Sequence, residues 1–132
     1  ELTVTYNQNS ATCTALYDTG NSLKDSFSGR PVIIADKDFA QKIIGRNAEL
    51  TEQKNFRLIP YSTIKNGGAL PAFLAEKITL KTAKGEVCAE KIYIAVAEQK
   101  LISGGFSALL GVPVFEAVDN RISGGFAAAE RG

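Results

Sequence analysis

The stretch Tyr17-Asp18-Thr19-Gly20-Asn21 decides how the rest of this sequence is interpreted. The residues before it are apolar and favour a strand, and the residues after it favour a turn. Gly20 allows the backbone to turn sharply and to approach the Asp18 carboxylate closely. The stretch therefore predicts an aspartate presented by a tight turn at the end of a strand, with Thr19, Gly20 and Asn21 supporting the turn.

A carboxylate in such a turn suits the hydrolysis of peptide bonds without a metal ion or a nucleophilic side chain. Asp18 would bind and deprotonate a water molecule. The mechanism needs one ionised and one protonated carboxyl group, and two carboxylates in contact share a proton because both cannot ionise cheaply. Asp-Thr-Gly occurs once in this chain, which indicates a dimeric aspartic protease to which each subunit contributes one aspartate. The Thr19 hydroxyl can then bond to its symmetry mate.

The tripeptide alone is weak evidence, because an ordinary tight turn capped by an aspartate also explains it. Its position relative to two later motifs strengthens the protease interpretation. Asn66, Gly67 and Gly68 lie between two apolar arms, which predicts a β-hairpin at the place where retroviral-type proteases carry a flap. The alternative for these residues is a plain surface hairpin.

The second later motif is Leu109-Leu110-Gly111, towards the C-terminal end of the chain. It resembles the hydrophobic-hydrophobic-glycine element that packs beside the catalytic turn in retroviral-type proteases. The alternative is an ordinary core strand. The order of the three motifs is stronger evidence than any one of them, and it predicts that this segment lies next to Asp18.

The composition fits one globular domain and excludes several classes of function. The 132 residues are 45% hydrophobic and carry a formal net charge of +1, with basic and acidic residues interleaved, so nothing indicates nucleic-acid binding. The absence of histidine removes Ser-His-Asp and Cys-His catalysis and the common zinc sites. We therefore expect no metal and no cofactor. The longest uncharged stretch, residues 101–115, is too short and too rich in glycine to span a bilayer.

The start of the chain and its two cysteines carry further expectations. Because the chain contains no methionine and begins at Glu1, we expect residues 1–132 to be a single domain excised from a longer protein. Cys13 and Cys88 have neither the spacing of a zinc knuckle nor that of a redox CxxC motif. Two buried free thiols are the favoured interpretation, and a disulfide between them stays open.

The hydrophobic pattern predicts a mainly β fold, a partly open barrel with one or two short helices. One helix is expected over residues 37–44, with Asp36 as its N-cap and Gly45 as its stop signal. Residues 107–115 are apolar, and the Gly- and Ala-rich residues 120–132 are expected to be partly mobile. Strands are expected over residues 2–6, 11–17, 30–35, 56–59, 78–81 and 87–97, the last two pairing across a turn.

Four segments, residues 17–25, 29–34, 56–62 and 70–73, resemble the peptidase domain of the sporulation sigma-E factor-processing peptidase of endospore-forming bacteria. The similarity extends over most of the chain, roughly residues 14–113, and its first segment is the most specific. It implies a retropepsin-like aspartic protease half-barrel. Asn21 departs from the Ser or Ala usual at this position in pepsin-like and retroviral enzymes, but it agrees with this family.

The resemblance implies a role and a setting for the chain. Asp18 would be the catalytic residue, supported by Thr19 and Gly20. The domain would dimerise and remove the pro-sequence of an inactive sigma factor, at the cytoplasmic face of the cell membrane. The parent protein would be anchored there by helices that this chain lacks, and a signalling protein from the other compartment would activate it.

A second class of function stays open from the sequence. A non-catalytic retropepsin-like module could bind or scaffold a partner through the same groove. The sequence favours the enzyme, because Asp18, Thr19 and Gly20 are all present and a scaffold would not need the carboxylate.

Overall fold

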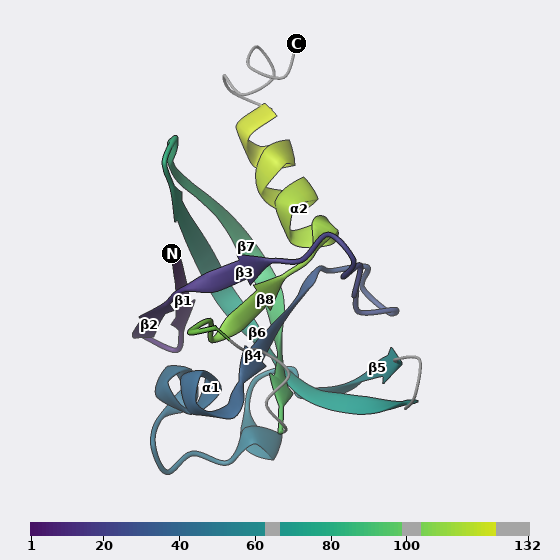
Figure 1. Cartoon of the computed structure of the whole chain (residues 1–132). Helices are drawn as coiled ribbons and strands as arrows, with labels where there is room; N and C mark the ends of the chain where they lie inside the picture. Colours follow the sequence, from purple (N-terminus) through teal and green to yellow (C-terminus); the bar gives the residue numbers. More distant parts are fainter. Residues whose placement is uncertain (63–66, 99–103, 124–132) are drawn as a thin grey trace.

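The computed structural model describes residues 1–62, 67–98 and 104–123, and these form a mainly β half-barrel with two short helices and one 3-10 turn (Figure 1). This confirms the fold class expected from the sequence. The strands are β1 (Leu2–Tyr6), β2 (Asn9–Cys13), β3 (Ala15–Tyr17), β4 (Val32–Asp36), β5 (Arg57–Ser62), β6 (Gly67–Thr82), β7 (Gly85–Ala97) and β8 (Ala108–Leu110). The helical elements are α1 (Lys37–Ile44), α2 (Val112–Ser123) and the 3-10 turn Leu50–Glu52.

The strands form one curled sheet in the order β2-β1-β6-β7-β4-β8-β3, and β5 pairs with β6 away from this path. Its scaffold is the long antiparallel hairpin of β6 and β7, which begins where Thr82 pairs with Gly85. Gly85 has a φ of 121°, which it adopts at low cost because it has no side chain. The predicted pairing of residues 78–81 with residues 87–97 is confirmed.

β4 lies at the centre of the fold, parallel to β7 on one side and antiparallel to β8 on the other. Four consecutive residues of β4 are buried, because both faces of the strand are covered. Ile33 and Ala35 join the main core with α1, whereas Val32 joins a smaller cluster that includes Ile59 and Tyr93. β8 pairs with β4, and β3 pairs with β8 at the edge of the sheet, so the position of β3 depends on β4.

Helix α1 begins and ends where its local signals predict. The Asp36 carboxylate accepts a hydrogen bond from the Phe39 N–H at 2.8 Å, as an N-cap does. Gly45 ends the helix with a φ of 115° and donates its N–H to the Gln41 carbonyl. Phe39, Ala40 and Ile43 are buried on the face that meets the sheet, so the predicted helix is confirmed.

Two local expectations were wrong. The single strand expected over residues 11–17 is two strands, because β2 pairs antiparallel with β1 whereas β3 pairs parallel with β8. Residues 120–123, expected to belong to a mobile tail, continue α2. Pro113 fits near the start of this helix, because the first N–H groups of a helix have no carbonyl within it to donate to and a proline there costs no hydrogen bond.

Cys13 and Cys88 are both free, and each is half-buried rather than fully buried. They lie on β2 and β7, with β1 and β6 between them, which corresponds to roughly 14 Å at ordinary strand spacing. A disulfide needs Cα atoms within about 7 Å, so the fold keeps the two thiols apart. In the described part of the chain, neither helix has the length and apolar character needed to cross a bilayer.

Candidate active site

Asp18 follows directly on β3 and lies in a turn, not on a helix. Its backbone N–H donates to the Leu110 carbonyl of β8 at 2.8 Å, which extends the parallel ladder in which Tyr17 pairs with Leu110. Its carbonyl accepts the Asn21 N–H at 3.1 Å and closes the turn. The backbone on both sides of the aspartate is therefore fixed by hydrogen bonds.

The Asp18 carboxylate is half-buried, and the turn orients it. Its Oδ1 accepts the backbone N–H of Gly20 at 3.0 Å, an arrangement typical of aspartates in turns. A Cβ at Gly20 would lie 3.4 Å from this oxygen, which is an ordinary contact. No hydrogen bond within the described residues reaches Oδ2, so one oxygen is held and the other is available to a solvent molecule or a second carboxyl group.

Asn21 and Gly111 join the turn to the segment after β8. The Asn21 carbonyl accepts the Val112 N–H at 2.9 Å, and its side-chain Oδ1 accepts the Leu23 N–H at 3.0 Å. A Cβ at Gly111 would lie only 2.3 Å from the Asn21 carbonyl oxygen, so only glycine fits there. The Asn21 Nδ2 is buried and has no hydrogen-bond partner among the described residues.

The structure thus brings two sequence-predicted segments together. Leu109, Leu110 and Gly111 lie beside Asp18, with Leu110 and Gly111 buried and Leu109 half-buried. Thr19 is exposed on the outside of the turn. The turn faces a cleft of about 550 Å³, lined by Asp18, Gly20, Asn21, Ser22, Leu23, Lys24, Ser26, Ile34, Pro60 and Leu109.

Comparison with protein-family models gives a match to the sporulation factor SpoIIGA family, Peptidase_U4, over residues 1–112. The chain belongs to the sporulation factor SpoIIGA family. The matched residues include the Asp18 turn, the β5–β6 hairpin and the Leu109-Leu110-Gly111 segment. No curated protein and no solved structure gave a significant match. The resemblance stated from the sequence is therefore confirmed, and the chain is a peptidase domain of this family.

The flap candidates of this SpoIIGA-family domain lie on the β5–β6 hairpin. The antiparallel pairing of β5 with β6 confirms the predicted hairpin. Gly67 and Gly68 are already in β6, opposite Ser62 and Tyr61. Asn66 lies outside the described residues. Pro60 of β5 lines the cleft, so the hairpin borders the site, and its role as a flap stays a prediction.

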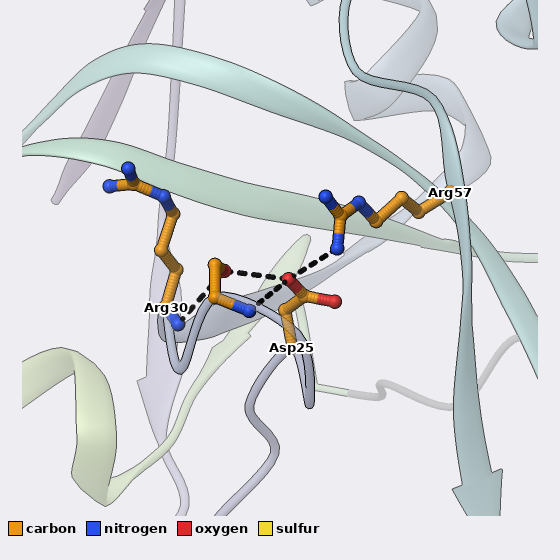
Figure 2. Close-up of polar contacts among 4 residues, drawn as sticks. Asp25, Arg30 and Arg57 are labelled. Carbon is orange, nitrogen blue, oxygen red and sulfur yellow. Dashed lines mark hydrogen bonds and ion pairs between the residues drawn. The ribbon is translucent and has the colours of Figure 1, made fainter.

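A buried ion pair beside the cleft was missed by the sequence analysis. Asp25 is 3% exposed, and its Oδ2 accepts the Ser28 N–H at 3.0 Å, the Ser28 hydroxyl at 2.6 Å and Arg57 Nη1 at 2.8 Å. Figure 2 shows Arg57 extending to this carboxylate, whereas the Arg30 guanidinium points away from it. The pair ties the loop after the Asp18 turn to β5 of the hairpin.

Asp25 remains ionised despite its burial. Burial by itself would raise the pKa of this carboxyl group. The hydrogen bonds from Ser28 and the hydrogen bond and charge of Arg57 outweigh that effect, and the pKa lies below its ordinary value of 3.8. No sequence signal singled out this pair, because its partners lie on segments far apart in the chain.

The Arg57 guanidinium also contacts two aromatic rings. Its central carbon lies 5.3 Å from the ring centroid of Phe27 and 5.4 Å from that of Tyr93, within the range of cation–π contacts. Tyr93 is buried in β7, whereas Phe27 is 90% exposed at the tip of the loop. Arg57 therefore links the loop tip, the hairpin and the centre of the sheet in this family member.

Proposed function

We propose that residues 1–132 form a single aspartic endopeptidase domain that is active as a twofold homodimer. The main observation in support of this proposal is that Asp18 is the only carboxylate among the described residues of the cleft. It is presented with one oxygen held by Gly20 and the other unbonded within the described residues. A carboxylate that only capped a turn would not need to face an open cleft.

The chemistry requires a second carboxyl group, and the dimer supplies it. A twofold axis next to the cleft would bring the Asp18 of two subunits together in one site. The two groups would share one proton, because two adjacent carboxylates cannot both ionise at low cost. The ionised group would take a proton from a water molecule, whose oxygen then attacks the scissile carbonyl carbon. The protonated group would give its proton to the carbonyl oxygen as the tetrahedral intermediate forms. The carboxyl group that took the proton from water would then pass it to the leaving nitrogen as the C–N bond breaks, and the hydroxyl proton would return to the other carboxylate as the carbonyl re-forms.

The surface around the turn suits such a dimer. β3 is the last strand of the sheet, with β8 as its partner among the described strands. Leu16 and Tyr17 of this strand are 40% and 46% exposed, directly before Asp18. Large apolar side chains exposed beside a functional carboxylate are typical of a surface that a partner covers. A second copy of the chain would bury them and bring in its own aspartate.

The proposed substrate is the pro-sequence of a sporulation sigma factor, as the family description and the segment over residues 17–25 support. The parent protein would act at the cytoplasmic face of the cell membrane, through a segment outside this chain, under the control of an activator protein. The β5–β6 hairpin, including Gly67 and Gly68, would close over the substrate as a flap.

The decisive experiment combines cleavage with subunit mixing. Wild-type protein is incubated with a recombinant pro-sigma factor, and Asp18→Asn is expected to abolish cleavage without changing the circular dichroism spectrum. Asp38→Asn is the matched control, because Asp38 is an exposed carboxylate on α1, away from the cleft. Excess Asp18→Asn added to wild type should lower activity further than simple dilution does, because mixed dimers hold one carboxylate only.

Sedimentation across a concentration series tests the dimer directly. The specific activity should rise with the fraction of dimer. Full specific activity in a strictly monomeric sample would exclude the shared site. Cleavage by Asp18→Asn at the wild-type rate would exclude Asp18 as a catalytic residue and favour the scaffolding module.

A further inference from the structure

A second pocket adjoins the cleft on the side of the β5–β6 hairpin. It has a volume of about 370 Å³ and lies between the loop that carries Asp25 and strand β5. Ser26 and Pro60 line both this pocket and the cleft at Asp18, so the two cavities are adjacent. Its lining residues are Asp25, Ser26, Phe27, Arg57, Leu58 and Pro60.

The charged residues of this pocket neutralise each other. The Asp25 carboxylate binds Arg57 at 2.8 Å and receives both hydrogen bonds of Ser28. Because the ion pair carries no net charge, it offers little attraction to a charged ligand. The walls above it are apolar, from Phe27, Leu58 and Pro60. A neutral, apolar group is the ligand chemistry that fits.

Two side chains of the pocket are exposed to a degree that folding does not explain. Phe27 is 90% exposed and Leu58 is 63% exposed, and both are among the few exposed large apolar residues of the described chain. Each forgoes the stabilisation that burial of a large apolar side chain gives. Their meeting at one pocket therefore indicates a partner that covers them.

The ion pair and the ring contacts hold the walls in place. Arg57 extends from β5 and binds Asp25 in the loop (Figure 2). Its guanidinium carbon also lies 5.3 Å from the centroid of the Phe27 ring. The same guanidinium carbon lies 5.4 Å from the centroid of the Tyr93 ring, and Tyr93 is 1% exposed in the core. The spacing between the loop and β5 is thus set by a hydrogen-bonded ion pair whose carboxylate is buried.

We propose that this pocket is a specificity subsite that takes one large aliphatic or aromatic side chain of the peptide substrate, with Phe27 and Leu58 as its walls. This inference rests on the proposed endopeptidase function. A peptide bound at Asp18 that extends past Ser26 and Pro60 reaches the pocket without leaving the surface. Phe27 and Leu58 determine specificity, and Arg57 and Asp25 position them.

The test compares cleavage of a position-scanning peptide library by wild type, Phe27→Ala and Leu58→Ala. At one substrate position, the preference of wild type for Leu, Phe or Tyr over Ala should fall about tenfold in each variant, as expected for apolar contacts in a pocket. The loss should appear in kcat/KM for the large side chains, and peptides with Ala at that position should be cut at an unchanged rate. Lys84→Ala, in the distant β6–β7 turn, is the control.

The variants Arg57→Lys and Arg57→Gln test whether Arg57 positions the pocket walls or only stabilises the fold. Both variants should reduce the same preference and raise KM more than they lower kcat, whereas loss of folded enzyme alone would lower kcat at constant KM. Arg46→Gln is the matched control, because Arg46 is exposed in the loop after α1.

The outcomes distinguish this inference from the proposed function. Asp18-dependent cleavage with an unchanged preference in Phe27→Ala and Leu58→Ala overturns the subsite alone. If those variants weaken self-association in sedimentation and keep the preference, the occupant is a second copy of the chain and the subsite is again wrong. Absence of Asp18-dependent cleavage by wild type overturns the proposed function and the subsite with it.

Discussion

Gly111→Ala should inactivate the proposed endopeptidase by displacing the Asp18 turn. The new Cβ would lie 2.3 Å from the Asn21 carbonyl oxygen and 3.0 Å from two Asn21 carbon atoms. An ordinary carbon–oxygen contact is about 3.3 Å, so the backbone of Asn21 must move by about 1 Å. No change of side-chain rotamer relieves the clash, because the nearest atom belongs to the backbone and accepts the Val112 N–H.

Two magnitudes follow from this displacement. A shift of about 1 Å in groups that position a reaction can cost about a hundredfold in rate. Overpacking of a close contact costs about 1–3 kcal/mol of unfolding free energy, which corresponds to a fall in Tm of about 4–12 °C for a domain of this size. Cleavage of a pro-sigma factor and thermal unfolding, both measured on Gly111→Ala, check the two values.

Gly68→Ala is the matched control for stability, because a Cβ there would have no atom within 4 Å. Its Tm should stay close to that of wild type. A Gly111→Ala protein with wild-type Tm and activity would refute this prediction. It would mean that the Asp18 turn and the segment after β8 are not in close contact.

Three further predictions concern other parts of the molecule. Asp36→Ala should lower the unfolding free energy by about 1 kcal/mol in urea titrations, because the Phe39 N–H loses its cap, and an unchanged midpoint would contradict this. The pKa of folded Asp25 is below 3.8, so its ionisation stabilises the fold above about pH 4 and this contribution is lost as the pH falls further. Unfolding free energy should therefore fall more steeply on acidification in wild type than in Asp25→Asn, and parallel curves would argue against the ion pair. Burial, with a contribution from the Asp36 charge, raises the pKa of Cys13 to about 12. At pH 8 maleimide should therefore label Cys13 far more slowly than it labels the amino acid cysteine in solution. Equal labelling rates would be inconsistent with the structure.

The sequence predicted best those elements whose signals are local. Helix α1 was placed correctly because Asp36 and Gly45 act within a few residues of the helix ends. The β6–β7 hairpin followed from two apolar arms around a short polar turn. These features need no knowledge of the rest of the chain.

The features that the sequence missed depend on distant partners. The division of the segment at residues 11–17 into β2 and β3 follows from pairing with two different strands, which no local pattern reveals. The Asp25–Arg57 pair joins a loop to β5, and each residue alone looks like an ordinary surface charge. Helix α2 was not predicted; Gly111 precedes this helix and Pro113 lies at its start.

The site itself lies between these two cases. The Asp18 turn was predicted from a short local motif, and the structure places Asp18 directly after β3. The position of Leu109-Leu110-Gly111 beside the turn was inferred from the order of motifs and from resemblance, not from any period in the sequence. The cleft and the neighbouring pocket could not be predicted, because their walls come from the loop, β5 and β8 together.

The parallel pairing of β3 with β8 has a consequence for how the protein is made. Asp18 leaves the ribosome early, but the carbonyl that fixes it belongs to Leu110, which is synthesised near the end of the domain. The β6–β7 hairpin can form as soon as its own residues have emerged, whereas contacts between distant segments form slowly because a long loop must close first. The aspartate is therefore positioned only after Leu110 has been synthesised, and until then it lies on a loop without this hydrogen bond.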